Sequence, residues 1–262
     1  MSEAREPGAA PQDGPSRGNR LLGSMGAADF ALLAPHLEPM ALIAGTVLQE
    51  PGSDLSQVIF PGRGTVLSLI AVTRDGRVAE TAAVGCEGAM GGLLTMQGQT
   101  AFCRTVVQVG GAALRIEAAQ LAAVQAASAG IRNRMTTYGV ALLAQVLQSV
   151  ACAALHQVEA RSCRWLLTMQ DRVGRDELPL TQEYLADMLG VRRTTVTRVV
   201  AGLEQRGLIR HRRSRILVVD RPALEAASCE CHQTVLTQFE RVAPGLYPIR
   251  GVSPAPVHEG AL

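Results

Sequence analysis

The side chains best suited to chemistry in this sequence lie close together near its C-terminal end, at Arg192, Arg193, Thr194, Thr197 and Arg198. An arginine guanidinium can donate two parallel hydrogen bonds to a phosphate, or to the O6 and N7 atoms of a guanine. A threonine can bond a base edge or pack its methyl group on a thymine. These residue types at this spacing are suited to contact with a nucleic acid.

Two helices joined by a tight corner must hold these side chains. Thr181 is a suitable N-cap for the first helix, whose apolar side carries Leu185, Met188 and Leu189. Gly190 ends that helix and Val191 fills the corner. The sequence therefore predicts a short helix that ends in a sharp turn.

The second helix is predicted over residues 192–205. Its core-facing side carries Val196, Val199, Val200 and Leu203. The arginines and threonines then face solvent, which is the layout of a helix-turn-helix whose second helix enters the major groove. The plain alternative is a solvated amphipathic helix pair.

A basic hairpin is predicted directly after the second helix. Ile209 and the run 216–219 read as two strands, and the turn between them carries Arg212, Arg213 and Arg215. A hairpin in this position is a wing that can contact the phosphate backbone. The alternative is a charged surface loop.

The first half of the chain reads as a different kind of domain. Residues 21–36 have helical spacing, whereas residues 41–116 alternate short apolar runs with turn signals. Asp75-Gly76 is predicted to be a two-residue hairpin turn. This pattern favours a small antiparallel barrel or sandwich.

A long helix should connect the two halves. Ile131, Met135, Tyr138 and Leu142 step by intervals of four, three and four residues, which is the spacing of a coiled-coil seam. We expect this seam to face a second copy of the chain.

Residues 138–158 contain no Asp, Glu or Arg and are long enough to span a bilayer, but their glutamines and the lack of an aromatic belt favour a protein partner over a membrane. Trp165, on the following helix, is predicted to lie in the core.

Composition bounds the remaining possibilities. The chain has 262 residues, 47% of them hydrophobic, which is enough for two domains. The net charge is +2, and all 25 basic residues are arginine. Residues 1–20 and 244–262 are rich in Pro and Gly and are predicted to be disordered or loose. The N-terminal segment lacks the apolar stretch of a signal peptide, so a cytoplasmic location is expected.

The six cysteines form no recognisable framework in the sequence. Cys229, Cys231 and His232 are the densest group, but no second pair with zinc spacing follows. We therefore predict no metal and no cofactor, with the cysteines as small buried residues. A reactive thiol at Cys103 or Cys163 is the alternative. No catalytic motif is present, so an enzyme is not expected.

The whole chain resembles the Crp/Fnr family of bacterial transcription regulators over about residues 21–235. The resemblance implies an α+β fold with a cyclic-nucleotide-binding-like antiparallel β-roll as the sensor domain (21–130), a dimerisation helix (131–155) and a winged helix-turn-helix (156–235). It also implies the partners of the protein: a double-stranded DNA operator, a second copy of the chain, RNA polymerase and a small-molecule effector. The alternative is a ligand-sensing or interaction module that does not bind DNA.

Specific roles follow from the same resemblance. The family recognition helix has the form R-E-T-V-x-R, and the stretch RTTVTR from Arg193 to Arg198 matches it. The two arginines thus take base-contacting roles, and Thr194 replaces the usual Glu, which implies a different operator. Thr181 matches a phosphate-contacting position.

The predicted ligand pocket departs from the family pattern. Members that bind cyclic nucleotides carry a Gly-Glu pair followed by Arg-Ser. Here Gly91-Gly92 stands at the first pair, and Arg104 falls about two places late for the second. A cyclic nucleotide would lose its charge-assisted bonds, so we expect a different effector of unknown identity.

Overall fold

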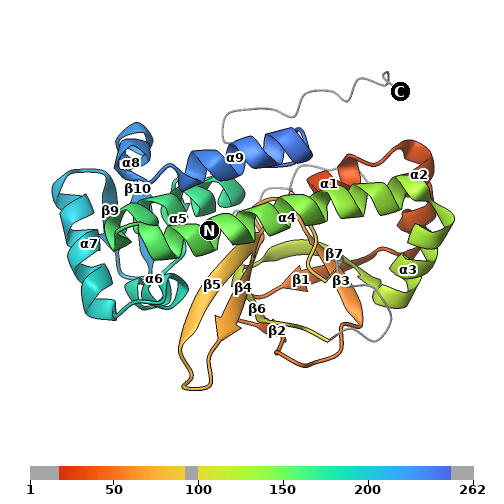
Figure 1. Cartoon of the computed structure of the whole chain (residues 1–262), viewed down its shortest axis with the longest axis horizontal. Helices are drawn as coiled ribbons and strands as arrows, with labels where there is room; N and C mark the ends of the chain where they lie inside the picture. Colours follow the sequence, from red (N-terminus) through yellow and green to blue (C-terminus); the bar gives the residue numbers. More distant parts are fainter. Residues whose placement is uncertain (1–17, 92–99, 249–262) are drawn as a thin grey trace, which may run out of the picture.

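The structure is a computed structural model that describes residues 18–91 and 100–248. Two antiparallel sheets occupy one half of the molecule and the helix-turn-helix occupies the other (Figure 1). One long helix, α4 (Ala129–Leu155), runs along both halves. The expected order of β-rich domain, long helix and C-terminal helical domain is confirmed.

The β-rich half is a roll of two antiparallel sheets. One sheet has the order β1-β7-β3 and the other β2-β6-β4-β5. The strands are β1 (Glu38–Leu42), β2 (Val47–Gln49), β3 (Gln57–Pro61), β4 (Val66–Val72), β5 (Val78–Val84), β6 (Arg104–Val109) and β7 (Gly111–Glu117). Inward-facing aliphatic side chains such as Ile59, Leu67 and Val107 are at most 4% exposed and form one core cluster within the roll.

The predicted hairpin at Asp75-Gly76 exists, but its loop is longer than expected. Strands β4 and β5 pair up to Val72 and Val78, so five residues, 73–77, connect them. Thr73 caps this loop because its hydroxyl donates to the carbonyl of Arg77 at 3.0 Å. Gly76 supplies the left-handed backbone that the turn requires, with φ +80°.

Short helices cover one end of the roll: α1 (Arg20–Gly23), α2 (Ala27–Leu33), the 3-10 helix η1 (Ala34–His36) and α3 (Ala118–Ala127). Residues 1–17 of the predicted N-terminal tail lie outside the described residues. Asn19, placed in that tail by the prediction, is instead buried. Its side chain caps α1 and donates to the carbonyls of Pro61 and Gly88, both at 2.9 Å.

The predicted dimer seam on α4 is wrong. Ile131, Met135 and Tyr138 are at most 2% exposed within a single chain, because they pack on the core formed by the roll, α1 and the C-terminal helix. Leu142 is partly buried against the same core. Ile131, Met135 and Tyr138 therefore hold the long helix onto the β-roll of the same chain and are not available to a second copy.

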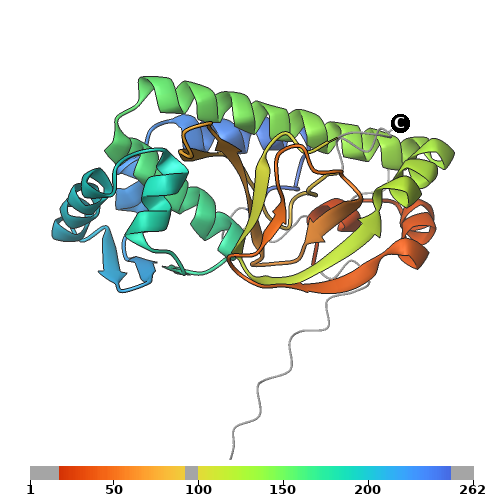
Figure 2. The same cartoon turned by 90° about the horizontal axis from the view of Figure 1, so that it is seen from below.

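A different face of α4 is open and apolar. Its exposed side chains are Val140 (50%), Leu143 (57%), Leu147 (61%), Val150 (63%) and Leu155 (77%). Figure 2 shows α4 along one edge of the molecule, with this side of the helix uncovered. By length and composition alone, Ala129–Leu155 is also the single described helix that could cross a membrane.

The C-terminal half contains α5 (Val158–Val173), β8 (Glu177–Leu178), α6 (Gln182–Leu189), α7 (Arg193–Gln205), β9 (Ile209–Arg212), β10 (Arg215–Val218), α8 (Arg221–Ala227) and α9 (Cys231–Val242). Trp165 is 1% exposed, as predicted. Helix α9 lies beside α4 in both views (Figures 1 and 2).

The prediction of a loose tail from residue 244 is wrong for its first residues. Leu246 and Tyr247 are 2% and 4% exposed and belong to the same core as α4. The Tyr247 ring meets Phe239 edge-on, with the ring centroids 5.1 Å apart. Aromatic packing thus fixes a segment whose Pro and Gly content suggested a loose chain. Residues 249–262 lie outside the described residues.

Candidate nucleic-acid interface

The corner between α6 and α7 forms as the sequence predicted. The Thr181 hydroxyl accepts a hydrogen bond from the backbone N–H of Tyr184 at 3.1 Å, which caps the start of α6. Gly190 ends the helix with φ +65°, a conformation that glycine adopts without strain. A Cβ at this glycine would also lie 3.3 Å from the Cβ of Ala79, so the corner sits directly on strand β5.

Helix α7 separates its apolar and polar residues onto two faces. Val196, Val200 and Leu203 are at most 1% exposed and pack against α5 and α6. The predicted contact residues all lie on the exposed side: Arg192, Arg193, Thr194, Thr197 and Arg198. The packing of the valines thus orients one continuous hydrogen-bonding face toward solvent.

Thr197 differs from its neighbours because its hydroxyl already has partners. It donates to the side-chain oxygen of Gln182 at 2.8 Å and lies 3.1 Å from the backbone carbonyl of Arg193. These contacts tie α7 to the start of α6. With the hydroxyl engaged, the methyl group of Thr197 suits an apolar contact better than the side chain suits a hydrogen bond.

Strands β9 and β10 form the predicted wing. Arg212 lies opposite Arg215 in the ladder, and residues alternate across the hairpin, so Arg210 shares their outward face. Arg213 occupies the turn with φ +40°, an uncommon conformation for a residue with a side chain. Sequence reasoning missed Arg210, although strand alternation from Arg212 could have identified it.

The wing arginines are not equivalent. Arg215 forms an ion pair with Glu177 on the neighbouring strand β8. Within residues 18–91 and 100–248, no ion pair involves Arg210, Arg212 or Arg213. Those three guanidiniums therefore remain available to an anionic partner, whereas Arg215 must first exchange Glu177.

The sequence of this region matches a known domain. Residues 160–227, from α5 to the end of α8, fit the family model of the Crp-like helix-turn-helix domain. We refer to this segment as the Crp-like domain. No curated protein matches the sequence of the chain.

Solved structures extend the likeness in fold beyond this domain to about three quarters of the chain. A protein from Eubacterium rectale assigned to the Crp/Fnr family of transcriptional regulators is 18% identical, with a TM-score of 0.61 over 79% of this chain and 96% of that one. FixK2 from Bradyrhizobium japonicum is 13% identical, with a TM-score of 0.62 over 74% and 98%. The c-di-GMP-responsive regulator CLP of Xanthomonas campestris is 17% identical, with a TM-score of 0.61 over 74% and 99%. The resemblance to Crp/Fnr regulators is thus confirmed, by sequence for the Crp-like domain and by fold for the rest.

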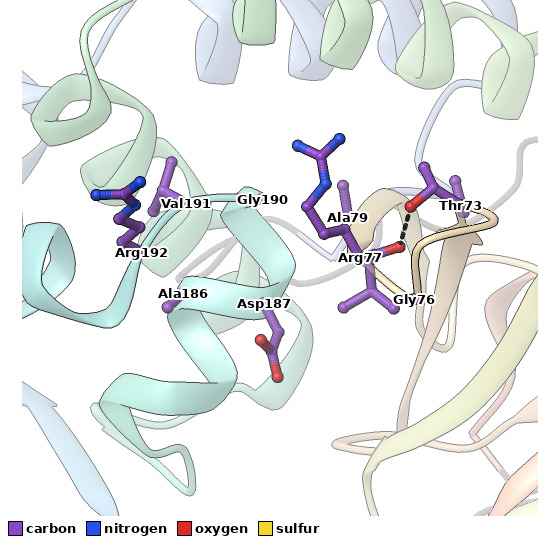
Figure 3. A pocket seen from close by; sticks show the side chains of 11 residues that line it. Thr73, Gly76, Arg77, Ala79, Ala186, Asp187, Gly190, Val191 and Arg192 are labelled. Carbon is purple, nitrogen blue, oxygen red and sulfur yellow. Dashed lines mark hydrogen bonds between the residues drawn. The ribbon is translucent and has the colours of Figure 1, made fainter.

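An open cleft of ≈ 850 Å³ lies between the Crp-like domain and the β-roll. The loop 73–77 and the start of β5 form one wall, and the corner from Ala186 to Arg192 forms the other (Figure 3). Arg77 and Arg192 flank the opening, and Asp187 lies below it. Burial, with Glu183 nearby, raises the pKa of Asp187 above its usual range. A molecule in this cleft would touch both domains at once.

Beside the cleft, a polar chain links the two domains through the core. The Trp165 indole on α5 donates to Glu80 on β5 at 2.8 Å, and the Ser68 hydroxyl on β4 lies 2.6 Å from the other Glu80 oxygen. Ser68 also lies 3.4 Å from the Tyr184 hydroxyl on α6. Burial raises the pKa of Glu80, although both hydrogen bonds act against this shift. A movement of β4 or β5 would therefore act directly on α5 and α6 through these hydrogen bonds.

The family's ligand-contacting positions are only partly described. Gly92 lies outside the described residues. Arg104, which the sequence placed two positions late, pairs with Glu50 at 3.0 Å on the edge of the roll. That arginine already has a carboxylate partner in the same domain.

Proposed function

We propose that this chain is a sequence-specific transcription regulator that binds a double-stranded DNA operator as a homodimer. The observation that carries the proposal is the exposed face of α7, which continues into a wing whose arginines point to solvent. The function is therefore that of a binding protein rather than of an enzyme. A regulator of this type acts in the cytoplasm and is expected to contact RNA polymerase.

The two parts of the interface take different roles in this proposal. Arg193 and Arg198 donate to base edges in the major groove, and Thr194 and the Thr197 methyl contact neighbouring bases. Thr181 lies at the start of α6 and Arg192 directly before α7, and both contact phosphates. Arg210, Arg212, Arg213 and, after release from Glu177, Arg215 hold the backbone beside the groove.

We infer that the second copy covers the exposed apolar face of α4. Val140, Leu143, Leu147 and Val150 recur at intervals of three, four and three residues, which is the spacing of a coiled-coil seam. Helix α4 carries no Asp, Glu or Arg after Arg134, so this apolar face gains nothing from exposure to water. A parallel pair of α4 helices would hold two recognition helices on one side of the dimer, as a palindromic operator requires.

We further propose that the effector acts where the β-roll meets the Crp-like domain. The cleft beside Arg77 and Arg192 and the Glu80 link both span this junction. A ligand that binds one arrangement of the two domains more tightly shifts the population toward it. Because the pattern that recognises a cyclic nucleotide is missing, a different small molecule is expected.

Selection from a random DNA pool tests this function. The wild-type chain should enrich a palindromic sequence, whereas Arg193→Ala should enrich a weaker or altered one. Arg132→Ala is a matched control, because this exposed arginine lies at the far end of α4. A module that does not bind DNA would enrich no sequence and would show no salt-dependent binding to random duplex.

A further inference from the structure

A cluster of metal-binding side chains lies where the long helix ends and the C-terminal helix begins. Cys152 is in the last turn of α4 and His156 follows that helix directly, while Cys229 and Cys231 precede and begin α9. One ligand atom from each residue lies within 4.8 Å of the other three. The DNA-binding function proposed above gives these side chains no role.

The fold brings together two pairs that are far apart in the sequence. Cys152 and His156 are four residues apart, so they share one side of the helix end. The backbone N–H of His156 bonds the carbonyl of Cys152 at 3.2 Å, so the last helical hydrogen bond of α4 reaches His156. Packing of α9 along α4 then brings the Cys229 sulfur to 3.5 Å from the Cys152 sulfur, and the Cys231 sulfur to 3.5 Å from His156 Nδ1.

The burial of the cluster suits a structural ion. Cys152 and Cys231 are 0% exposed and Cys229 is 7% exposed. The His156 side chain is 23% exposed and forms the solvent side of the cluster. Bulk water is thus kept away from the thiols, while an ion can enter the cluster on the partly exposed side, at His156.

The spacing of the ligand atoms favours one ion over a cluster of several. With metal–sulfur bonds of about 2.3 Å, neighbouring ligands of a tetrahedral zinc ion lie about 3.8 Å apart. The two contacts of 3.5 Å are close to that distance. The ligands of an iron–sulfur cluster are divided among two or more iron atoms, so ligands on different irons must lie further apart than the four atoms here, which are all within 4.8 Å of one another.

The surroundings of the cluster also match those of a metal site. His156 Nε2 lies 3.2 Å from a Glu230 carboxylate oxygen, so Nε2 carries the proton and Nδ1 is free to bind the ion. The Gln148 amide donates to the Cys231 sulfur at 3.0 Å. The hydrogen bond with Cys229 and, to a smaller extent, the nearby charge of Arg164 lower the pKa of Cys152. The buried Nε of Arg164 has no hydrogen-bond partner among the described residues. Three thiolates and a divalent ion carry one net negative charge, which this arginine offsets.

We propose that Cys152, His156, Cys229 and Cys231 bind one tetrahedral zinc ion. Three sulfur ligands and one nitrogen ligand fill the coordination sphere and leave no open position, as in structural zinc sites. The ion joins the end of α4 to the start of α9. It therefore fixes the helix with the exposed apolar face relative to the segment that follows the Crp-like domain.

Metal content of the full-length chain is the first test. Chain purified without chelators and without a metal-affinity tag should contain about one zinc ion, since all four ligands come from one chain. Cys152→Ser and Cys231→Ser should lose most of this zinc. Cys163→Ser is the matched control, because Cys163 is equally buried but lies outside the cluster, and it should retain the metal.

A second variant separates loss of metal from loss of folding. Glu230 is 73% exposed, so Glu230→Gln should leave the fold unchanged. Because its carboxylate orients His156, this change should lower zinc affinity about 10- to 100-fold. Zinc competition with a chromophoric chelator measures the affinity, and circular dichroism checks the fold.

Cobalt substitution tests the geometry. Metal-free chain loaded with Co²⁺ should show strong tetrahedral d–d bands and sulfur-to-cobalt charge transfer, and Cys229→Ser should weaken the latter. Three results would each overturn the proposal. The first is an equal zinc content in the wild type and the ligand variants, and the second is iron together with acid-labile sulfide. The third is a chain that, when purified under reducing conditions, contains no metal and has a Cys152–Cys229 disulfide.

Discussion

Arg172 Nε lies 2.7 Å from a carboxylate oxygen of Glu87, and both side chains are at most 1% exposed. Arg172 comes from α5 in the Crp-like domain, whereas Glu87 follows β5 in the β-roll. The same guanidinium donates to the Gln145 side chain of α4 at 2.7 Å and to the Tyr247 hydroxyl at 3.0 Å. One buried cation thus joins the β-roll, the long helix, the Crp-like domain and the C-terminal segment.

Removal of this arginine should destabilise the chain strongly. Arg172→Met leaves Glu87 as a buried charge without its partner, which costs about 3–5 kcal/mol. The exposed pair Arg206–Glu159 provides the control, because Arg206→Met should cost at most about 1 kcal/mol. Urea unfolding followed by circular dichroism measures both. An equal loss of stability in the two variants would contradict the assigned role of Arg172.

Glu80 should make stability depend on pH in a defined direction. Burial raises its pKa in the folded chain, so the folded state holds this proton more tightly than the unfolded state does. The resulting stabilisation is complete below the usual glutamate pKa and is lost as the pH rises through the raised value. The stability of Glu80→Gln minus that of the wild type should therefore increase with pH over this window and then level off.

The single tryptophan gives an independent readout of the same group. Trp165 donates directly to Glu80, so its fluorescence should titrate in the folded chain above the usual range of a glutamate. Glu80→Gln should abolish that transition. A transition that persists in the variant would show that another group is responsible.

The exposed face of α4 should control the oligomeric state. Leu147→Arg places a charge in the proposed dimer seam and should give a folded monomer that binds operator poorly. Phe102→Arg is the control, because Phe102 is 73% exposed but lies on the roll, and this variant should remain dimeric. Light scattering distinguishes the outcomes. A wild type that is monomeric, or that requires detergent, would argue against the second copy as the occupant of this face.

Substitutions in the seam predicted from the sequence should lower stability and leave dimerisation intact, unlike substitutions on the exposed face of α4. Ile131 is fully buried within one chain, so Ile131→Ala should cost about 2–5 kcal/mol of stability. Its effect on dimerisation at low temperature should be small. Chemical unfolding and sedimentation of the same sample separate these two effects.

The local features of the DNA-binding half were predictable because neighbouring residues determine them. Thr181, Gly190 and the valines of α7 fix a cap, a corner and a buried stripe without help from distant segments. The seam on α4 was misassigned because the helix is apolar on two faces. Periodicity finds both faces, but it cannot decide which one the chain covers with its own β-roll.

Other features depend on contacts between distant segments. Cys152 and Cys229 are 77 positions apart in the sequence, so ligand spacing along the chain gives no hint of their proximity. Tyr247 follows a Pro-Gly segment that suggests a loose tail, yet Arg172 and Phe239 hold it in the core. Such groupings become visible only when the packing of α4 against α9 is known.

Affinity for the selected operator and its single-base variants, measured at several salt concentrations, tests the central claim most directly. Arg193→Ala and Arg198→Ala should each cost about 1–3 kcal/mol, lower specific affinity and relax preference at one base pair. Arg212→Ala should weaken all sequences alike and reduce the salt slope by about one. Thr194→Glu should change the preferred base without abolishing binding. If the α7 variants left base preference unchanged, the assignment of α7 as the recognition helix would be contradicted.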